Sequence, residues 1–246
     1  MLAAASFSPP STFSSMAMPR MAAPPMVPTM TPSAPMTPQA PVPQRAMAAA
    51  MPPMPVGTIE QVAADLKRSG EAGRRVTVAG AAHDVGTTFA AIKLARILAE
   101  DANVVLVDLA FGAPNLSVIS TDPSAPGMAE LIRGQASFGD VITRDQFSGV
   151  HLVATGNIGQ KGLSLAASPM VATAIEALAR SYAYVVIDAG AISDPVAERF
   201  APLAQRAVLV TADPANPATR AAHEQMTMVG FGQVSLVAGV SEAAAA

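Results

Sequence analysis

The stretch Val76–Leu98, VTVAGAAHDVGTTFAAIKLARIL, carries the pattern that decides the fold. Its first residues, Val76–Ala79, are apolar and β-branched, which is typical of a short buried strand. A glycine-containing turn follows, and from Gly86 to Glu100 the apolar side chains recur at helical spacing. The stretch therefore predicts a strand, a tight turn and an amphipathic helix in direct succession.

The same alternation of strand and helix continues along the chain. Further strands are predicted at the apolar runs Val104–Val107, His151–Ala154, Tyr184–Ile187, Ala207–Thr211 and Val234–Val237. Helices are predicted over Thr58–Ser69, Pro126–Arg133, Phe138–Thr143, Ser168–Ser181, Pro195–Leu203 and Asn216–Val229. Strands that are continuous apolar runs belong to parallel sheets buried on both faces. We therefore predict an α/β fold with a doubly wound, mostly parallel sheet and helices on both faces.

The N-terminal segment, residues 1–56, differs from the rest in composition. It is rich in Pro, Met, Ala and Ser, and Arg20 and Arg45 are its only charged side chains. Because recurrent prolines prevent a continuous helix, we expect a disordered segment over 1–56, one domain over 57–241 and a tail over 242–246. Two alternatives for the segment are a docking tail whose methionines meet an apolar groove of a partner, and a misplaced gene start.

Composition excludes several classes of function. The 246 residues include no cysteine, so the chain can form neither a disulfide nor a thiolate metal site. A formal net charge of −3 gives no basic field for nucleic acid, and no partner of that kind is expected. His151 and His223 stand alone in their segments and suggest no metal site. No apolar run is long enough to span a membrane, and the N-terminus lacks the features of a secretory signal. We therefore expect a cytoplasmic protein.

Polar residues gather where the predicted strands end. Asp108 and Asp188 each follow a strand directly, and the turn 80–87 and the glycine-rich loop 156–162 follow two others. Ligands of a doubly wound sheet bind at this carboxyl edge. The convergence of two carboxylates and two glycine-containing loops therefore predicts a binding site there.

The turn 80–87 has most of the parts of a phosphate-binding loop (P-loop). Such a loop holds phosphates with backbone N–H groups, a helix N-terminus and a lysine, while a hydroxyl and a carboxylate hold magnesium. Gly86 stands at the second-glycine position and Thr88 can supply the hydroxyl. Thr87 stands where the lysine belongs, and Ala81 occupies the first-glycine position, with Gly80 one residue out of register.

Three further charges bear on phosphate binding. Asp84 lies in the turn, where its carboxylate would replace the anion at the helix N-terminus and repel a triphosphate. Lys93 is about 10 Å along the helix from Gly86, too far to replace the missing lysine. Lys161, in the loop 156–162, is the better candidate for a relocated lysine because that loop also lies at the carboxyl edge.

These segments together resemble the bacterial tyrosine kinases (BY-kinases) of exopolysaccharide synthesis, relatives of the MinD/ParA ATPases. VTVAGAAHDVGTTFAAIKLARILA is similar to their P-loop strand and helix, and NVVLVDLAFGAPNLS to their second aspartate motif. Three further segments resemble those that follow in the family, in the same order: PGMAELIRGQASFGDVI, GVHLVATGN and LAASPMVATAIEALARSYAYVVIDAGAISD. The resemblance covers about residues 58–240.

The resemblance implies ATP and magnesium as ligands. It places Gly86 and Thr88 in the nucleotide site, with Thr87 at the lysine position, and makes Thr88, Asp108 and Asp188 the magnesium ligands. Asp108 and Asp188 would also be the catalytic residues of an active enzyme.

The chain also departs from the family pattern. Ala110 replaces the second aspartate of the DAD motif, Gly112 and Ala113 replace the basic pair after it, and alanines stand where the family has a tyrosine-rich tail. The first hypothesis is therefore a catalytically impaired, kinase-like partner or regulatory subunit of exopolysaccharide biosynthesis and export. It would dock at the cytoplasmic side of an inner-membrane polysaccharide co-polymerase (chain-length regulator), and a homo-oligomer is compatible with this role.

Two alternatives remain open. One is an active ATP-binding tyrosine kinase or ATPase with Lys161 as its relocated lysine. The other is a positioning ATPase of the MinD/ParA type, which would be expected to dimerise around nucleotide or to bind DNA or membrane.

Overall fold

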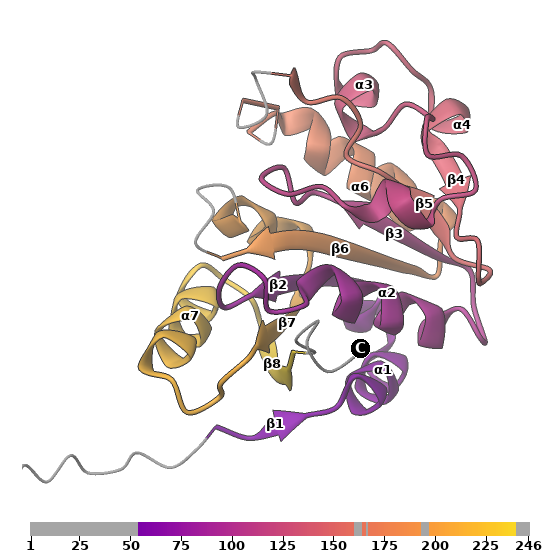
Figure 1. The fold of residues 1–246 in the computed structure, drawn as a ribbon. Helices are drawn as coiled ribbons and strands as arrows, with labels where there is room; N and C mark the ends of the chain where they lie inside the picture. Colours follow the sequence, from indigo (N-terminus) through magenta and orange to yellow (C-terminus); the bar gives the residue numbers. More distant parts are fainter. Residues whose placement is uncertain (1–53, 160–163, 166, 193–196, 240–246) are drawn as a thin grey trace, which may run out of the picture. The chain divides into compact units, whose positions relative to one another are not determined.

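The computed structural model of the chain describes residues 54–159, 164–165, 167–192 and 197–239. Within these residues the chain forms an eight-stranded sheet with helices on both faces (Figure 1). The predicted fold class, a doubly wound and mostly parallel α/β sheet, is confirmed. The expected disorder of the N-terminal segment concerns residues that lie almost entirely outside the described ones.

The strand order is β1-β8-β7-β2-β6-β3-β5-β4. All neighbours are parallel except β4 and β5, which are antiparallel. The bounds are β1 Val56–Gly57, β2 Arg75–Gly80, β3 Val104–Asp108, β4 Ile142–Arg144, β5 His151–Val153, β6 Tyr184–Ala191, β7 Arg206–Thr211 and β8 Gln233–Ala238. The P-loop-like strand β2 therefore lies in the middle of the sheet, between β7 and β6.

Two apolar cores lie on opposite faces of the sheet. Helices α1 (Ile59–Arg68) and α2 (Thr87–Leu98) cover one face. The other face is covered by α3 (Met128–Ile132), α6 (Pro169–Ser181), α7 (Pro217–Met228) and the 3₁₀ helix η4 (Ala197–Leu203). The shorter elements are α4 (Phe138–Val141) and the 3₁₀ helices η1 (Gly70–Gly73) and η2 (Leu116–Ile119). No helix in the described part of the chain is long and apolar enough to cross a bilayer.

Three helices begin at the capping residues that the sequence indicated. Thr58 and Gln61 form a reciprocal capping box at α1. Ser168 caps α6 and Asn216 caps α7, each followed by a proline at the first helical position. Local capping chemistry therefore fixes where these helices start.

The prediction was wrong at one place, right about a helix but not about its type at a second, and incomplete at a third. The expected helix Phe138–Thr143 stops at Val141, because Ile142–Arg144 instead pairs with β5 and extends the sheet. Within Pro195–Leu203, residues 197–203 form a 3₁₀ helix containing Pro202, which has no N–H to donate to an α-helical ladder. The strand β1 was not predicted, since two residues carry no readable period.

Thr77 in β2 carries a buried hydroxyl that has no hydrogen-bond partner in the described part of the chain. We expect Thr77→Val, which keeps the side-chain shape, to raise the free energy of unfolding by about 1 kcal/mol, because an unsatisfied buried hydroxyl is costly. Urea unfolding measures the change.

The matched control for this prediction is Thr211→Val on the neighbouring strand β7. The Thr211 hydroxyl is equally buried but bonds to Thr219 Oγ1 at 2.7 Å and donates to the Asp213 carbonyl at 3.2 Å. Its loss should lower stability by about 1–2 kcal/mol. Equal destabilisation by both substitutions would contradict the interpretation of Thr77.

Candidate functional site

The turn between β2 and α2 is built around two glycines. Gly86 precedes α2 with a left-handed backbone, φ 80°, which glycine adopts without strain. A Cβ at Gly80 would lie 2.3 Å from Thr87 Oγ1 and 2.7 Å from the Ala82 carbonyl oxygen. The Thr87 hydroxyl therefore lies against Gly80, where only glycine leaves room for it.

The turn is also held by the neighbouring strands. Ala81 donates its N–H to the Val210 carbonyl at 2.8 Å, and the buried Val85 side chain belongs to the core beneath α1 and α2. A Cβ at Gly239 would come within 2.0 Å of the Val85 carbonyl oxygen. Asp84, exposed between these anchors, has a left-handed backbone with φ 57°, a conformation that aspartate tolerates better than most residues.

Asp108 and Asp188 meet at the carboxyl edge of the sheet. They are register partners on β3 and β6, with exposed fractions of 1% and 0%. Asp188 accepts hydrogen bonds from the Thr88 hydroxyl at 2.6 Å and from the Gly190 N–H at 3.0 Å. The structure thus brings Thr88, Asp108 and Asp188 to one place, as the sequence predicted.

The oxygens of Asp108 are bound within its own loop. Oδ1 accepts the Ala110 N–H at 3.0 Å and Oδ2 accepts the Leu116 N–H at 3.3 Å. The Thr155 hydroxyl donates to the Asp108 backbone carbonyl at 3.1 Å. Asp108 therefore shapes the path of the chain after β3, in addition to any ligand it holds.

Burial dominates the electrostatics of the pair. Burial, with the charge of Asp188 as a second cause, raises the pKa of Asp108 to about 7, against the hydrogen bonds from Ala110 and Leu116. Burial also raises the pKa of Asp188, against the hydrogen bonds from Thr88 and Gly190. Among the described residues, no Lys, Arg or His side chain forms an ion pair with either carboxylate.

Two curated proteins are similar in sequence. The succinoglycan biosynthesis transport protein ExoP of Rhizobium meliloti is 30% identical over 155 residues, which cover 61% of this chain and 20% of ExoP. The tyrosine-protein kinase ptk of Acinetobacter johnsonii is 28% identical over 114 residues, 46% of this chain and 16% of that kinase. The chain spans about a fifth of the length of these relatives or less. No family model matches it.

Solved structures show the same fold. The VpsO kinase domain superposes with a TM-score of 0.64 at 21% identity, covering 74% of this chain and 95% of that domain. The chain thus resembles the bacterial tyrosine kinases in sequence and shares the fold of a kinase domain. The septum site-determining protein MinD of Pyrococcus horikoshii, solved with Mg-ADP, gives a TM-score of 0.53 at 20% identity and covers 66% of this chain and 67% of MinD.

The two ligands expected from the sequence, magnesium and ATP, fit this site unequally. Thr88, Asp108 and Asp188 present the hydroxyl and carboxylate oxygens that magnesium prefers, so these three residues would hold it. The phosphate side fits poorly, because the lysine position is Thr87 with its hydroxyl turned onto Gly80, and the turn carries the Asp84 carboxylate. The described residues include no group of three or more His, Cys, Asp or Glu that could hold a metal. Among these residues, Asp108 and Asp188 therefore have no third acidic residue beside them.

The structure tests the prediction for only one of the two lysines considered as phosphate ligands. Lys93 forms an ion pair with Glu60 on α1 at 2.7 Å, which agrees with its exclusion as a phosphate ligand. Lys161 lies outside the described residues, so its predicted role stays a prediction. The loop that leads to it does lie at the carboxyl edge, where Arg133 donates to the carbonyls of Asn157 and Ile158 at 2.7 and 3.1 Å.

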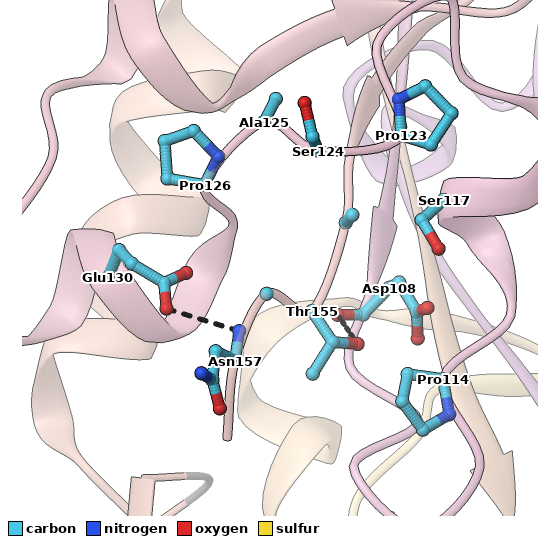
Figure 2. Close-up of a pocket in the computed structure, with 12 residues that line it drawn as sticks. Asp108, Pro114, Ser117, Pro123, Ser124, Ala125, Pro126, Glu130, Thr155 and Asn157 are labelled. Carbon is cyan, nitrogen blue, oxygen red and sulfur yellow. Dashed lines mark hydrogen bonds between the residues drawn. The ribbon is translucent and has the colours of Figure 1, made fainter. Parts of the chain in front are cut away.

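A pocket beside Asp108 was not predicted from the sequence. Figure 2 shows it between the segment that follows β3 and the loop that follows β5; its volume is about 510 Å³. It is lined by Asp108, Pro114, Ser117, Pro123, Ser124, Ala125, Pro126, Glu130, Ala154, Thr155, Gly156 and Asn157. The cluster of prolines at 114, 123 and 126 was the available signal, but only the fold brings it against residues 154–157.

Proposed function

We propose that this chain is a kinase-like P-loop protein with impaired phosphotransfer that serves as a partner or regulatory subunit in exopolysaccharide biosynthesis and export. The observation that carries the proposal is Thr87 at the lysine position, folded against Gly80. A P-loop lysine brings a positive charge to the transferred phosphates, and a threonine hydroxyl cannot replace that charge.

The rest of the site supports the same conclusion. Ala110 removes a second acid next to Asp108, and Asp84 adds a carboxylate on the phosphate side. The parts that remain also have structural roles: the Thr88–Asp188 hydrogen bond joins α2 to β6, and Asp108 organises the loop after β3. Their retention is therefore explained without phosphotransfer.

The partner in this proposal is an inner-membrane polysaccharide co-polymerase, or chain-length regulator. ExoP, which is similar to this chain over 155 residues, is named as a biosynthesis transport protein of succinoglycan, and the chain matches only a fifth of it. We infer that this chain works at the cytoplasmic side of the inner membrane through such a partner.

The second candidate is an active ATPase in which Lys161 replaces the P-loop lysine. Arg133 favours it, because its two hydrogen bonds hold the preceding residues of that loop at the carboxyl edge. A third candidate, a MinD/ParA-type positioning ATPase, has only the shared fold in its favour.

Calorimetric titration with Mg·ATP tests the proposal. We expect no measurable binding to the wild type and measurable binding to Thr87→Lys, because the turn and helix N-terminus remain in place and only the charge is restored. The double substitution Asp84→Gly/Thr87→Lys should bind several-fold more tightly, since a repelling carboxylate is also removed.

The control is Lys161→Ala. Tight binding by the wild type that Lys161→Ala abolishes would favour the second candidate. Tyrosine autophosphorylation by the wild type at a rate of about 1 s⁻¹ or more, which is ordinary for kinases, would overturn the proposal.

A further inference from the structure

A second pocket lies at the edge of the sheet opposite to the P-loop-like turn. Its volume is about 320 Å³. It is lined by Glu71, Arg74, Arg75, Glu176, Ala179 and Arg180. Arg75 begins β2 and Gly80 ends it, so the length of the strand separates this pocket from the turn by about 16 Å. A ligand bound here would therefore leave the nucleotide side of the fold open.

Arg74 forms a fixed wall of the pocket. Its Nε donates to the Ala183 carbonyl at 3.3 Å. Its Nη2 donates to the carbonyls of Ala179 and Tyr182 at 3.0 and 3.1 Å, at the C-terminal end of α6. Its Nη1 pairs with the Glu71 carboxylate at 2.9 Å. Arg74 and Glu71 therefore satisfy each other, and the remaining charges of the lining decide what the pocket can bind.

Those remaining charges come from two elements. Strand side chains alternate between faces, so Arg75 points to the same face as Ala79, whose core includes the apolar side of α6. Arg180 lies in the last turn of α6, and Glu176 lies one turn before it. Among the described residues, Arg75 and Arg180 form no ion pair. Two guanidinium groups thus face one carboxylate, which leaves one positive charge in excess.

The chain has few other acids that could supply the missing negative charge. Residues 1–53 contain no aspartate or glutamate. Three acids have side chains outside the described ones, namely Asp194, Glu198 and Glu242. Asp194 and Glu242 follow β6 and β8 in the sequence, and those strands end at the opposite edge of the sheet. Removal of all three acids is nevertheless one arm of the test.

We propose that this pocket binds the carboxylate of an aspartate or glutamate side chain of a partner protein. Guanidinium groups hold a carboxylate by paired, charge-assisted hydrogen bonds. The single positive charge in excess matches a monoanion, whereas a doubly charged phosphate would also be repelled by Glu176.

The mixed charge of the lining favours a protein over a membrane surface. Basic and acidic side chains alternate around the pocket, which suits a protein surface of complementary charge. Anionic lipid headgroups would instead meet the carboxylates of Glu71 and Glu176. The inference goes beyond the proposed function, because it concerns the edge of the sheet away from the nucleotide side.

The test uses the full chain at pH 7 and low salt with two capped peptides as probes, acetyl-Ala-Glu-Ala-amide and its glutamine counterpart. Backbone amide chemical shifts of Arg75, Glu176 and Arg180 are followed during titration. We expect these shifts to saturate with the glutamate peptide and the glutamine peptide to bind at least about fivefold more weakly, because charge-assisted hydrogen bonds are lost. Inorganic phosphate at the same ionic strength should bind no more tightly than the glutamate peptide.

Four variants separate the pocket from general electrostatics. Arg75→Gln/Arg180→Gln should abolish the glutamate-specific shifts. Glu176→Gln should tighten binding of the glutamate peptide severalfold, because it removes a repelling carboxylate. Arg144→Gln, at an exposed position on the edge strand β4, is the matched control and should leave binding unchanged. The variant Asp194→Asn/Glu198→Gln/Glu242→Gln should also bind as the wild type does.

The outcomes are distinct from those of the nucleotide titration. Equal binding of the two peptides, or glutamate-specific shifts that persist in Arg75→Gln/Arg180→Gln, would overturn the inference. Tighter binding of phosphate would overturn it in favour of a phosphate ligand. A gain of about tenfold or more in the variant that lacks the three acids would show that the chain fills the pocket itself. The Mg·ATP titration tests the proposed function separately from each of these results.

Discussion

Replacing Asp108 with asparagine will stabilise the protein by about 3 kcal/mol more at pH 8 than at pH 5. Burial and the neighbouring charge of Asp188 raise the pKa of Asp108 from 3.8 to about 7. A carboxyl whose pKa is raised by folding stabilises the protein fully below its ordinary pKa, and this contribution is lost as the pH rises towards 7. Between pH 5 and 7 the loss is about 1.4 kcal/mol per unit, and asparagine does not suffer it.

Urea unfolding of the wild type and Asp108→Asn at pH 5, 6, 7 and 8, without divalent cations, measures this difference. Asp122→Asn, at an exposed position in the loop after β3, is the matched control. Its free energy of unfolding should change with pH in the same way as that of the wild type. If the free energy of unfolding of Asp108→Asn also followed that of the wild type at every pH, burial would not destabilise the ionised Asp108 carboxylate. Added magnesium should stabilise the wild type at pH 8 and leave Asp108→Asn nearly unchanged, if Thr88, Asp108 and Asp188 hold the ion.

The fold was predictable because its central strands are buried on both faces. Such strands leave uninterrupted apolar runs, and four of them, β2, β3, β6 and β7, form the middle of the sheet together. The edges were not predictable. β1 has two residues and β4 has three, too few to show a period, and their pairing depends on the strands already in place.

The sequence predicted which residues meet at the carboxyl edge of the sheet, but not the hydrogen bonds that their side chains form there. Strand ends placed Asp108 and Asp188 correctly, because parallel strands bring their carboxyl ends to one side of the sheet. The turn after β2 placed Thr88 beside them. The sequence could not show that Asp108 turns towards the N–H groups of Ala110 and Leu116, since that depends on the backbone path after β3.

Gly80 illustrates the same difference. From the sequence it was a first glycine one residue out of register. In the structure its lack of a side chain admits the Thr87 hydroxyl at a distance that a Cβ would forbid. The packing of the turn therefore depends on Gly80 and Thr87 as a pair.

Arg96→Met will lower the free energy of unfolding by about 3 kcal/mol. Arg96, in the last turns of α2, donates from Nε and Nη2 to the two oxygens of Asp145, both at 2.8 Å. The Asp145 side chain is 1% exposed, so the substitution leaves a buried carboxylate without its cation. The guanidinium also lies over the Phe147 ring, 5.4 Å from its centroid, and this contact is lost too.

Lys93→Met on the same helix is the matched control for Arg96→Met. Lys93 and Glu60 pair at 2.7 Å, but their side chains are 47% and 57% exposed, and solvent screens such a pair so that it contributes far less than a buried one. Equal losses in the two variants would mean that burial of Asp145 does not decide the cost. A selective loss for Arg96→Met would identify the Arg96–Asp145 pair as the link that fixes the β4–β5 hairpin to α2, the helix whose first turn carries Thr87 and Thr88.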